Sequence, residues 1–335
     1  DIYHLYNIWG PQMIENGVLA APPEEVVNWI RENYIGATVD TVTINDQTWG
    51  IPTEVSNYML VYNKKLLAEA GFDAPPATWE ELVTMAEALT ERNDEGNIVQ
   101  AGYSYGPSTA TIVHPFLIML YSQGVNPFTD DFSGTNLTSP EAIDVLTKQV
   151  ELYQKGVTDR SIEVWNFPSG TIGMMFMAPW YESTLREAFG DEFENTVGVA
   201  PIPMGENWRS MQYAFFYGVD ANSDVQEEAW QFLQWLNTGQ DGSISCMGAM
   251  LMSLGALTAN NGDIAAAQDS LGDSYTKPFV DALERSSSEP NVMQASEIQT
   301  ILQTYIEQAW AGDLTPEEAL TQADAEISEI LSEFY

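Results

Sequence analysis

The sequence predicts an α/β protein of two lobes that are joined by crossing strands. The chain has 335 residues, which is enough for two domains that each bury a core of their own. Residues Ile51–Asn63 combine an opening proline with β-branched and aromatic residues, a composition that favours a strand over a helix. The period changes directly afterwards, where Lys64–Ala70 predicts a short helix that stops at Gly71. We therefore expect Ile51–Asn63 to cross from one lobe into the other.

The same region resembles a known family. Pro52 opens the strand, Tyr62-Asn63-Lys64 ends it, Gly71 and Pro76 interrupt the chain, and Thr78-Trp79-Glu80-Glu81-Leu82 starts a helix. In this combination the motifs resemble those of the extracellular solute-binding proteins of ABC importers, the family that includes maltose-binding protein. The resemblance implies a periplasmic-binding-protein-like fold of type II, in which crossing strands act as hinges between the lobes. It covers nearly the whole sequence, although no single motif is specific.

The lobes that this resemblance implies are discontinuous in sequence. Lobe I is expected to comprise residues 1–53 and 214–288, and lobe II residues 57–209 and 292–335. The hinges are expected near residues 52–58, 210–214 and 289–294.

The resemblance also implies that the family's first strand–helix–strand portion precedes Asp1. Asp1, Gly17 and Leu19 fit a pattern that the family places after its first strands. A lobe without those strands would expose unpaired strand edges. We therefore expect either a shortened sequence or a complementing segment elsewhere.

The remaining elements follow from local signals in chain order. Thr38–Pro52 predicts a β-hairpin with its turn at Asn45-Asp46. Thr78 and Glu81 form a capping box before an apolar helix face, and Ser139-Pro140 starts a helix that Gly156 ends. These signals predict two helices in lobe II.

The second half of the chain continues the resemblance. Trp165–Trp180 is similar to a family signature, and Val197–Pro203 matches a strand that precedes the return to lobe I. Met211–Val219 is expected to be the second crossing strand, which returns the chain to lobe I. A third crossing, back to lobe II, is expected near Pro290–Ala295.

Further capping signals mark the last helices. Ser223 with Gln226, and Thr315 with Glu318, are expected to cap helices. The stripe Met247–Met252 is expected to lie in the core, together with the only cysteine, Cys246.

Charge excludes several classes of partner. Forty-nine acidic residues against 11 basic ones give a net charge of −38, and the acids are scattered along the sequence. Nucleic acid is excluded because its binding needs basic patches, and anionic lipids and phosphorylated ligands are disfavoured. Such acidity suits high salt, an acidic exterior or simple solubility, and these three alternatives stay open.

Catalytic and metal motifs are weak. Gly102-Tyr103-Ser104-Tyr105-Gly106 has the outline of a hydrolase nucleophile elbow, but no histidine follows a later acid, so a strand-end turn is favoured. A single cysteine excludes an intrachain disulfide and a cysteine-based zinc site, and the two histidines have no metal-ligand spacing. A glycosidase would need two carboxylates placed across a sugar, which the sequence cannot place. We expect a protein that is not an enzyme and that needs no cofactor or metal.

Aromatic and polar residues at the expected cleft are the candidates for ligand contact. Trp180 falls where the family has an aromatic sugar platform, and a core tryptophan is the alternative for it. The other candidates lie in the loop after Asp1, on the two crossing strands and at an expected helix start in lobe II: Tyr6, Asn7, Trp9, Glu54, Ser56, Asn57, His114 and Tyr213. For each of them, a structural role in packing is the alternative.

The resemblance implies the substrate-binding component of an ABC importer. Aromatic faces suit the C–H surfaces of sugars, so we expect a neutral sugar or oligosaccharide, delivered to the transmembrane permease subunits by a monomer. The family implies a location outside the cytoplasmic membrane, tethered through the part that precedes Asp1. Two alternatives remain: a binding protein for polyamines or other cations, which the negative charge would favour, and a structural or sensory protein of the cell surface.

Overall fold

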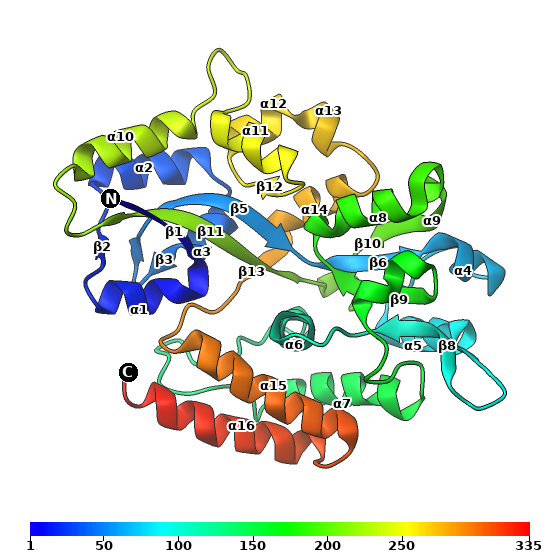
Figure 1. The fold of residues 1–335 in the computed structure, drawn as a ribbon. Coiled ribbons are helices and arrows are strands. Elements are labelled where there is room, and N and C mark those ends of the chain that lie inside the picture. Colours follow the sequence, from blue (N-terminus) through cyan, green and yellow to red (C-terminus); the bar gives the residue numbers. More distant parts are fainter. The chain divides into compact units, whose positions relative to one another are not determined.

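A computed structural model describes residues 1–335, apart from the side chains of residues 269 and 270 (Figure 1). The chain forms two compact units. Unit 1 comprises Asp1–Asn57, Ala178–Trp180 and Met211–Ser296, and unit 2 comprises Tyr58–Met177, Tyr181–Ser210 and Glu297–Tyr335. The predicted boundaries place residues 178–180 in lobe II, whereas these three residues pack with unit 1.

Unit 1 is built on a six-stranded sheet whose centre is the long strand β11 (Ser210–Asp220). Its order is β1 (Ile2–Tyr6), β11, β5 (Ile51–Asn57) and β12 (Leu257–Thr258), and β2 (Leu19–Ala20) and β13 (Ser286–Ser288) also pair with β11. β11 alternates between the buried side chains Ala214 and Phe216 and half-exposed aromatic ones. Phe216 packs with Leu5, Leu19 and Val42 in a hydrophobic cluster on the buried face.

The other elements of unit 1 are short. Its helices are α1 (Gly10–Glu15), α2 (Glu24–Asn33), α3 (Gly36–Thr41), α10 (Gln226–Leu236), α11 (Cys246–Ser253), α12 (Asn261–Ala266), α13 (Gln268–Leu271) and α14 (Thr276–Ala282), with 3-10 turns η1 (Asn7–Trp9) and η6 (Leu283–Arg285). A separate hairpin pairs β3 (Thr43–Ile44) with β4 (Gln47–Thr48).

Unit 2 has its own five-stranded sheet. The order is β10 (Val197–Ala200), β6 (Met59–Asn63), β9 (Ile172–Met177), β8 (Ile98–Ser104) and β7 (Glu91–Arg92), with β8 and β9 parallel. Every residue of β9 is buried, which explains its unbroken apolar sequence.

Helices make up most of the rest of unit 2. They are α4 (Lys64–Glu69), α5 (Trp79–Leu89), α6 (Thr109–Ser122), α7 (Pro140–Gln154), α8 (Glu182–Phe189), α9 (Phe193–Thr196), α15 (Ala295–Ala311) and α16 (Pro316–Leu331), with 3-10 turns η2 (Val164–Ser169), η3 (Pro179–Tyr181), η4 (Gly190–Glu192) and η5 (Gly205–Asn207). Within the part of the chain that the structure describes, no helix combines the length and the hydrophobicity that a membrane crossing requires.

The predicted helix starts with strong capping signals are confirmed. Both hydrogen bonds of the capping box are present at Thr78 and at Thr315. Ser139 Oγ accepts from the backbone N–H of Ala142 at the start of α7. Each interaction satisfies an N–H group that the helix itself leaves unpaired.

Two predicted strands need correction. Ile51–Asn63 is not one strand but two, β5 and β6, which belong to different sheets and are separated by Tyr58. The predicted hairpin has its turn at Asn45-Asp46, where φ is +52° and +62°, but residues 38–41 belong to α3. Asn and Asp tolerate this left-handed backbone, which two-residue hairpin turns require.

Three side-chain predictions are also wrong. α10 starts only at Gln226, and Ser223 Oγ accepts from the N–H of Val225 before the helix begins. Cys246 is exposed because it is the first residue of α11. Met247 and Leu251 of that helix are buried, but Met250 is 45% exposed, so only part of the methionine stripe is core.

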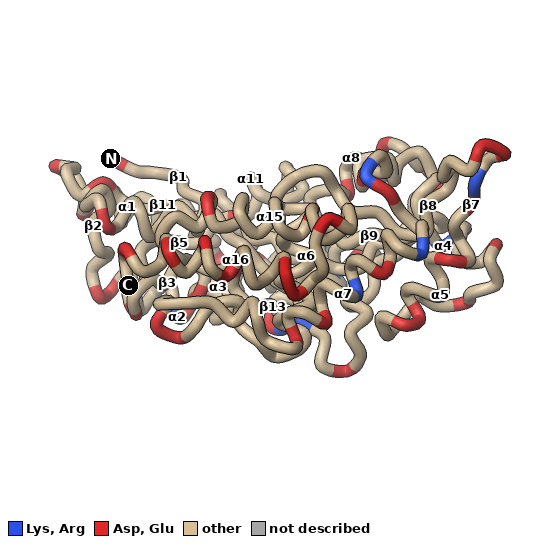
Figure 2. Tube along the Cα trace, turned by 90° about the horizontal axis from the view of Figure 1, so that it is seen from below, with Lys and Arg blue, Asp and Glu red and all other residues tan. Residues whose placement is uncertain are grey.

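Acidic residues are distributed along the whole trace, with few basic ones between them (Figure 2). The 11 Lys and Arg residues can neutralise at most 11 of the 49 negative charges. Exposed ion pairs such as Lys65–Glu192 contribute little to stability. The folded chain therefore concentrates uncompensated negative charge, which destabilises the compact state by self-repulsion.

We expect added salt to stabilise this protein. The Debye length falls from about 30 Å at 0.01 M to about 3 Å at 1 M ionic strength, so salt screens the repulsion between carboxylates. The Tm in 1 M NaCl should exceed the Tm in 0.01 M NaCl by at least about 2–4 °C, the shift that corresponds to about 1 kcal/mol in domains of this size. Differential scanning calorimetry measures both values. KCl should act as NaCl does, and an unchanged or lower Tm would show that self-repulsion does not limit stability.

Candidate functional site

Two neighbouring strands of unit 1 place aromatic side chains on one face of the sheet, and a third strand lies beside them. Tyr6 of β1 lies opposite Phe215 of β11, and Tyr213 of β11 lies opposite Ser56 of β5. Directly opposed residues of antiparallel strands project to the same side. Because Tyr213 and Phe215 alternate with buried residues, this half-exposed face of β11 is aromatic.

Tyr6 is the centre of the resulting cluster. Its ring stacks on Phe215 with the centroids 5.2 Å apart, and meets Tyr213 and Trp9 edge to face at 5.7 and 5.8 Å. Its hydroxyl donates to Glu289 Oε2 over 2.5 Å. Trp9 is 47% exposed, so the cluster ends in a large aromatic surface that faces solvent.

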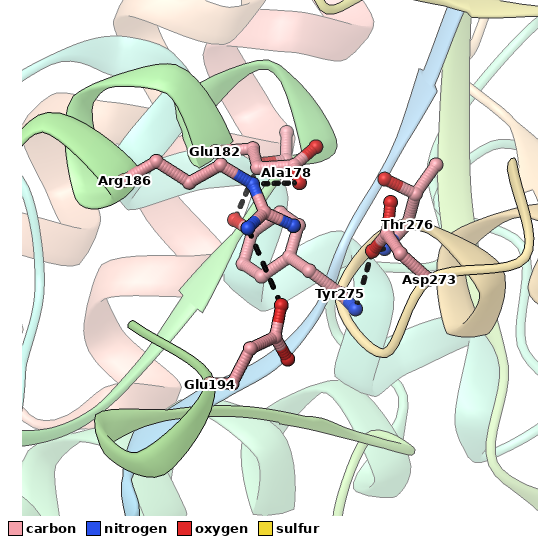
Figure 3. Close-up of polar contacts among 7 residues, drawn as sticks. All are labelled: Ala178, Glu182, Arg186, Glu194, Asp273, Tyr275 and Thr276. Carbon is pink, nitrogen blue, oxygen red and sulfur yellow. Dashed lines mark hydrogen bonds and ion pairs between the residues drawn. The ribbon is translucent and has the colours of Figure 1, made fainter. Parts of the chain in front are cut away.

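Trp180 joins the same cluster from a distant part of the chain. Its Nε1 donates to the hydroxyl of Tyr213 over 3.0 Å, and the indole is partly exposed. Ala178, two residues before Trp180, is anchored in unit 1, where the hydroxyl of Tyr275 lies 3.5 Å from its carbonyl oxygen (Figure 3). Asp273 fixes this tyrosine in turn by accepting from its backbone N–H over 2.8 Å. The Tyr213 hydroxyl thus holds the edge of the Trp180 ring that carries its nitrogen, and Tyr275 holds the backbone that leads to it.

The left part of Figure 3 shows a separate set of contacts within unit 2. Arg186 Nε donates to Glu182 Oε1 over 2.7 Å, and its Nη1 lies 3.3 Å from Glu194 Oε1. The guanidinium also lies 4.0 Å from the centroid of Phe193. These contacts join α8 to α9.

Two carboxylates lie near Tyr213. Glu289 is fully buried, and Glu54 of β5 is half-buried. Burial raises the pKa of the Glu54 carboxyl, since the low dielectric disfavours its charged form. Burial, with the Glu54 and Glu289 charges adding to it, raises the pKa of Tyr213 to about 12. Tyr213 therefore keeps its proton at neutral pH and can donate a hydrogen bond.

Asn7 and Asn57, two of the predicted contact residues, are buried and hydrogen-bonded. Asn7 Oδ1 accepts from the N–H of Ala214, and its Nδ2 donates to Asn291 Oδ1 over 2.7 Å. Asn57 Nδ2 donates to the carbonyl of Phe279 over 2.9 Å. Both amides thus join segments of unit 1. Ser56, which faces Tyr213, is buried as well, so among Glu54, Ser56 and Asn57 only Glu54 reaches solvent.

His114 belongs to unit 2, and its predicted location at a helix start is wrong. α6 begins at Thr109, so His114 and Pro115 lie inside the helix. The histidine is buried, and its Nδ1 lies 2.8 Å from the hydroxyl of Tyr58. The helix can hold a proline because Ile112–Ser122 is buried without interruption, and this packing offsets the lost backbone hydrogen bond.

The catalytic outline at residues 102–106 carries no nucleophile. Ser104 is buried at the end of β8, and its hydroxyl donates to the carbonyl oxygens of Tyr105 and Ile162. Among the described residues, no three His, Cys, Asp or Glu side chains are grouped so that they could hold a metal ion.

Phe215, Glu289 and Asn291 belong to the site and were absent from the sequence-based candidates. Phe215 could have been found by alternation, because it follows Tyr213 at the spacing of one strand face. Glu289 and Asn291 carry no local signal, since their partners Tyr6 and Asn7 lie more than 280 positions away along the chain.

The two units with their separate sheets, and an aromatic site on one of them, define a two-lobe solute-binding fold, as predicted. Residues 1–240 match the family model of the bacterial extracellular solute-binding proteins. The chain belongs to this family.

Individual relatives are distant in sequence. A binding protein of Brucella abortus is 27% identical over 246 residues, which cover 68% of this chain and 56% of that protein. The chain thus spans little more than half the length of this relative. Two solved structures share the fold. The sugar-binding protein MalE of Xanthomonas citri has a TM-score of 0.84 and 20% identity, over 99% of this chain and 84% of that one. An ABC transporter solute-binding protein of Thermotoga lettingae has a TM-score of 0.82 and 23% identity, over 99% of this chain and 85% of that one.

Proposed function

We propose that this protein binds a neutral sugar or oligosaccharide as the substrate-binding component of an ABC importer. The observation that carries the proposal is the aromatic cluster of unit 1 with a carboxylate beside it. Trp9, Trp180 and Tyr213 offer ring surface for the C–H faces of a sugar. Glu54 offers acceptor oxygens, and the hydroxyl of Tyr213 can both donate and accept. Few precisely placed polar groups within an apolar surface are typical of small-molecule sites.

The relatives support a sugar as the ligand. The Xanthomonas citri protein is a sugar-binding protein, and the Thermotoga lettingae structure holds α-D-tagatose. In the proposed cycle, the lobes close on the sugar, the complex docks on the permease, and the sugar is released. The chain passes between the units near Asn57, Ser210 and Ser296, and again on either side of Ala178–Trp180. We assign the hinges of this motion to the first three positions.

A cation is the second candidate ligand. Glu54 and the buried Glu289 add negative charge next to aromatic rings, and ring faces attract cations. A polyamine would therefore compete for the same site, in a protein whose net charge of −38 attracts cations from a distance.

A thermal-shift screen against neutral sugars and against polyamines tests both candidates. A ligand that binds only the native state stabilises it by about 2.7 kcal/mol at a hundredfold excess over Kd. We expect at least one sugar to raise the Tm, and spermidine and putrescine to raise it no more than NaCl does at equal ionic strength.

If only the polyamines raised the Tm above the NaCl control, the ligand of this site would be a cation and not a sugar. The absence of a shift with every member of both panels would contradict transport and favour a structural or sensory role. Sodium chloride at equal ionic strength is the control for the polyamines, because screening alone is expected to raise the Tm of this chain.

A further inference from the structure

Glu54 is the carboxylate that a molecule at the aromatic cluster of unit 1 can reach. It lies in β5 two residues before Ser56, which pairs with Tyr213, so Glu54 and Tyr213 lie on the same face of the sheet. Glu289, the other carboxylate near Tyr213, is fully buried and accepts from the hydroxyl of Tyr6. Glu54 is only half-buried. Of these two carboxylates, Glu54 alone is open to a ligand.

A β-bulge lies at Glu54. The register between β5 and β11 shifts here, so that Thr53 and Glu54 of β5 stand opposite the single residue Phe215 of β11. The ring of Phe215 carries the stacked ring of Tyr6. Bulges re-aim side chains and are common next to active sites. The bulge thus places Glu54 beside the stacked pair at the centre of the cluster.

The Glu54 carboxylate has no partner among the described residues. None of them donates a hydrogen bond to its oxygens or forms an ion pair with them, and burial raises the pKa of this carboxyl without an opposing contact. Its oxygens are also not among the inaccessible polar atoms that lack a partner, so they are open to solvent. A half-buried charge of this kind is stabilised by a ligand that donates hydrogen bonds to it.

The charge of Glu54 restricts the chemistry of that ligand. An ionised carboxylate only accepts hydrogen bonds, and its two oxygens can take two donors, such as adjacent hydroxyls of a sugar ring. The charges of Glu54 and Glu289 both contribute to the raised pKa of Tyr213, so the electric potential at its hydroxyl is negative. A carboxylate on the ligand would replace a donor by an acceptor and would be repelled.

We propose that Glu54 determines the specificity of this site: its carboxylate accepts from two adjacent hydroxyls of a neutral sugar and excludes sugars that carry a carboxylate. The inference rests on the proposed function, because it names the sugars that the site of unit 1 takes. Stacking on the aromatic rings is open to both kinds of sugar, since both have C–H faces. The distinction between them therefore depends on Glu54.

Isothermal titration with matched pairs of sugars tests this role. The pairs are D-glucose with D-glucuronate, D-galactose with D-galacturonate, and D-mannose with D-mannuronate, whose members differ only at C6. The titrations are made at about pH 8, where Glu54 is ionised, and in about 1 M NaCl, where a Debye length of about 3 Å screens the other, exposed acids. At least one neutral sugar should bind about tenfold or more tightly than its acid, because like charges in contact are strongly unfavourable.

Glu54→Gln removes the charge and keeps the size of the side chain. Affinity for the neutral sugar should fall about threefold to tenfold, since hydrogen bonds to a charged acceptor are roughly twice as strong as neutral ones. Affinity for the acid should stay equal or rise, because the amide supplies an N–H donor. The ratio of the two Kd values should therefore approach one. The Tm of the unbound variant should stay equal or rise, which separates the change in binding from a change in folding.

Glu25→Gln is the matched control, because it changes the net charge by the same amount. Glu25 is exposed at the start of α2, so the ratio of the two Kd values should be that of the wild type. Equal affinity for the members of each pair in the wild type, binding of the acids alone, or an unchanged ratio in Glu54→Gln would overturn this inference and leave sugar binding standing. If none of the six sugars binds, the function proposed for the site is contradicted, and this inference with it.

Discussion

Replacing Trp180 by alanine should weaken sugar binding about thirtyfold or more. Truncating an aromatic residue at the centre of a binding site costs about 2 kcal/mol or more of binding free energy, which corresponds to this factor in Kd. Trp180 is such a residue in the proposed site, because its ring is partly exposed to a ligand while its nitrogen is held by the hydroxyl of Tyr213. Isothermal titration with the sugar that raises the Tm measures the change.

Two further variants locate the effect. Trp180→Phe keeps an aromatic face but loses the bond to Tyr213, so its affinity should lie between those of the wild type and Trp180→Ala. Trp235→Ala is the matched control, since this tryptophan is 56% exposed on α10 and belongs to no part of the site. Wild-type affinity in Trp180→Ala would mean that the indole only packs against unit 1.

Helix starts could be predicted well from the sequence because their signals are local. The capping boxes at Thr78 and Thr315 place donor and acceptor three residues apart, and both formed. The turn at Asn45-Asp46 is equally local, because these side chains tolerate a positive φ.

The break between β5 and β6 could not be predicted, because its cause is distant in sequence. Residues 51–63 contain no glycine and no proline after Pro52, so no local breaker interrupts the strand. At the break, Ser210 Oγ accepts from the N–H of Tyr58 and donates to its carbonyl oxygen over 2.6 Å, from 152 positions away. A side chain thus replaces the strand partner at this one residue.

The candidate site was predicted where a motif or a pattern marked it. Tyr6, Trp180 and Tyr213 meet in one cluster, although their role in binding remains a prediction. Glu289 shows the limit of this approach. One glutamate among 49 acidic residues is uninformative, and only the fold brings its carboxylate to the hydroxyl of Tyr6.

Gly102→Ala should be among the most destabilising single substitutions in unit 2. Gly102 lies in β8 directly under α5, where a Cβ would come within 1.9 Å of the carbonyl oxygen of Ala86 and 2.5 Å of its Cα. These are backbone atoms of a buried helix position, so no side chain can rotate away. Overpacking of this kind costs about 3 kcal/mol, at the upper end of the usual range. Urea denaturation measures the change in the free energy of unfolding.

Gly36→Ala provides the matched control, because the two substitutions add the same methyl group. Gly36 starts α3, and a Cβ there would meet no atom within 4 Å. This change should be neutral or stabilise by up to about 1 kcal/mol, since alanine loses less backbone entropy in a helix. Equal stability of the two variants would show that α5 can shift away from β8. If the units unfold in separate calorimetric transitions, Gly102→Ala should lower the Tm of only one transition. The reason is that β8 and α5 both belong to unit 2, while unit 1 keeps all the contacts of its own core.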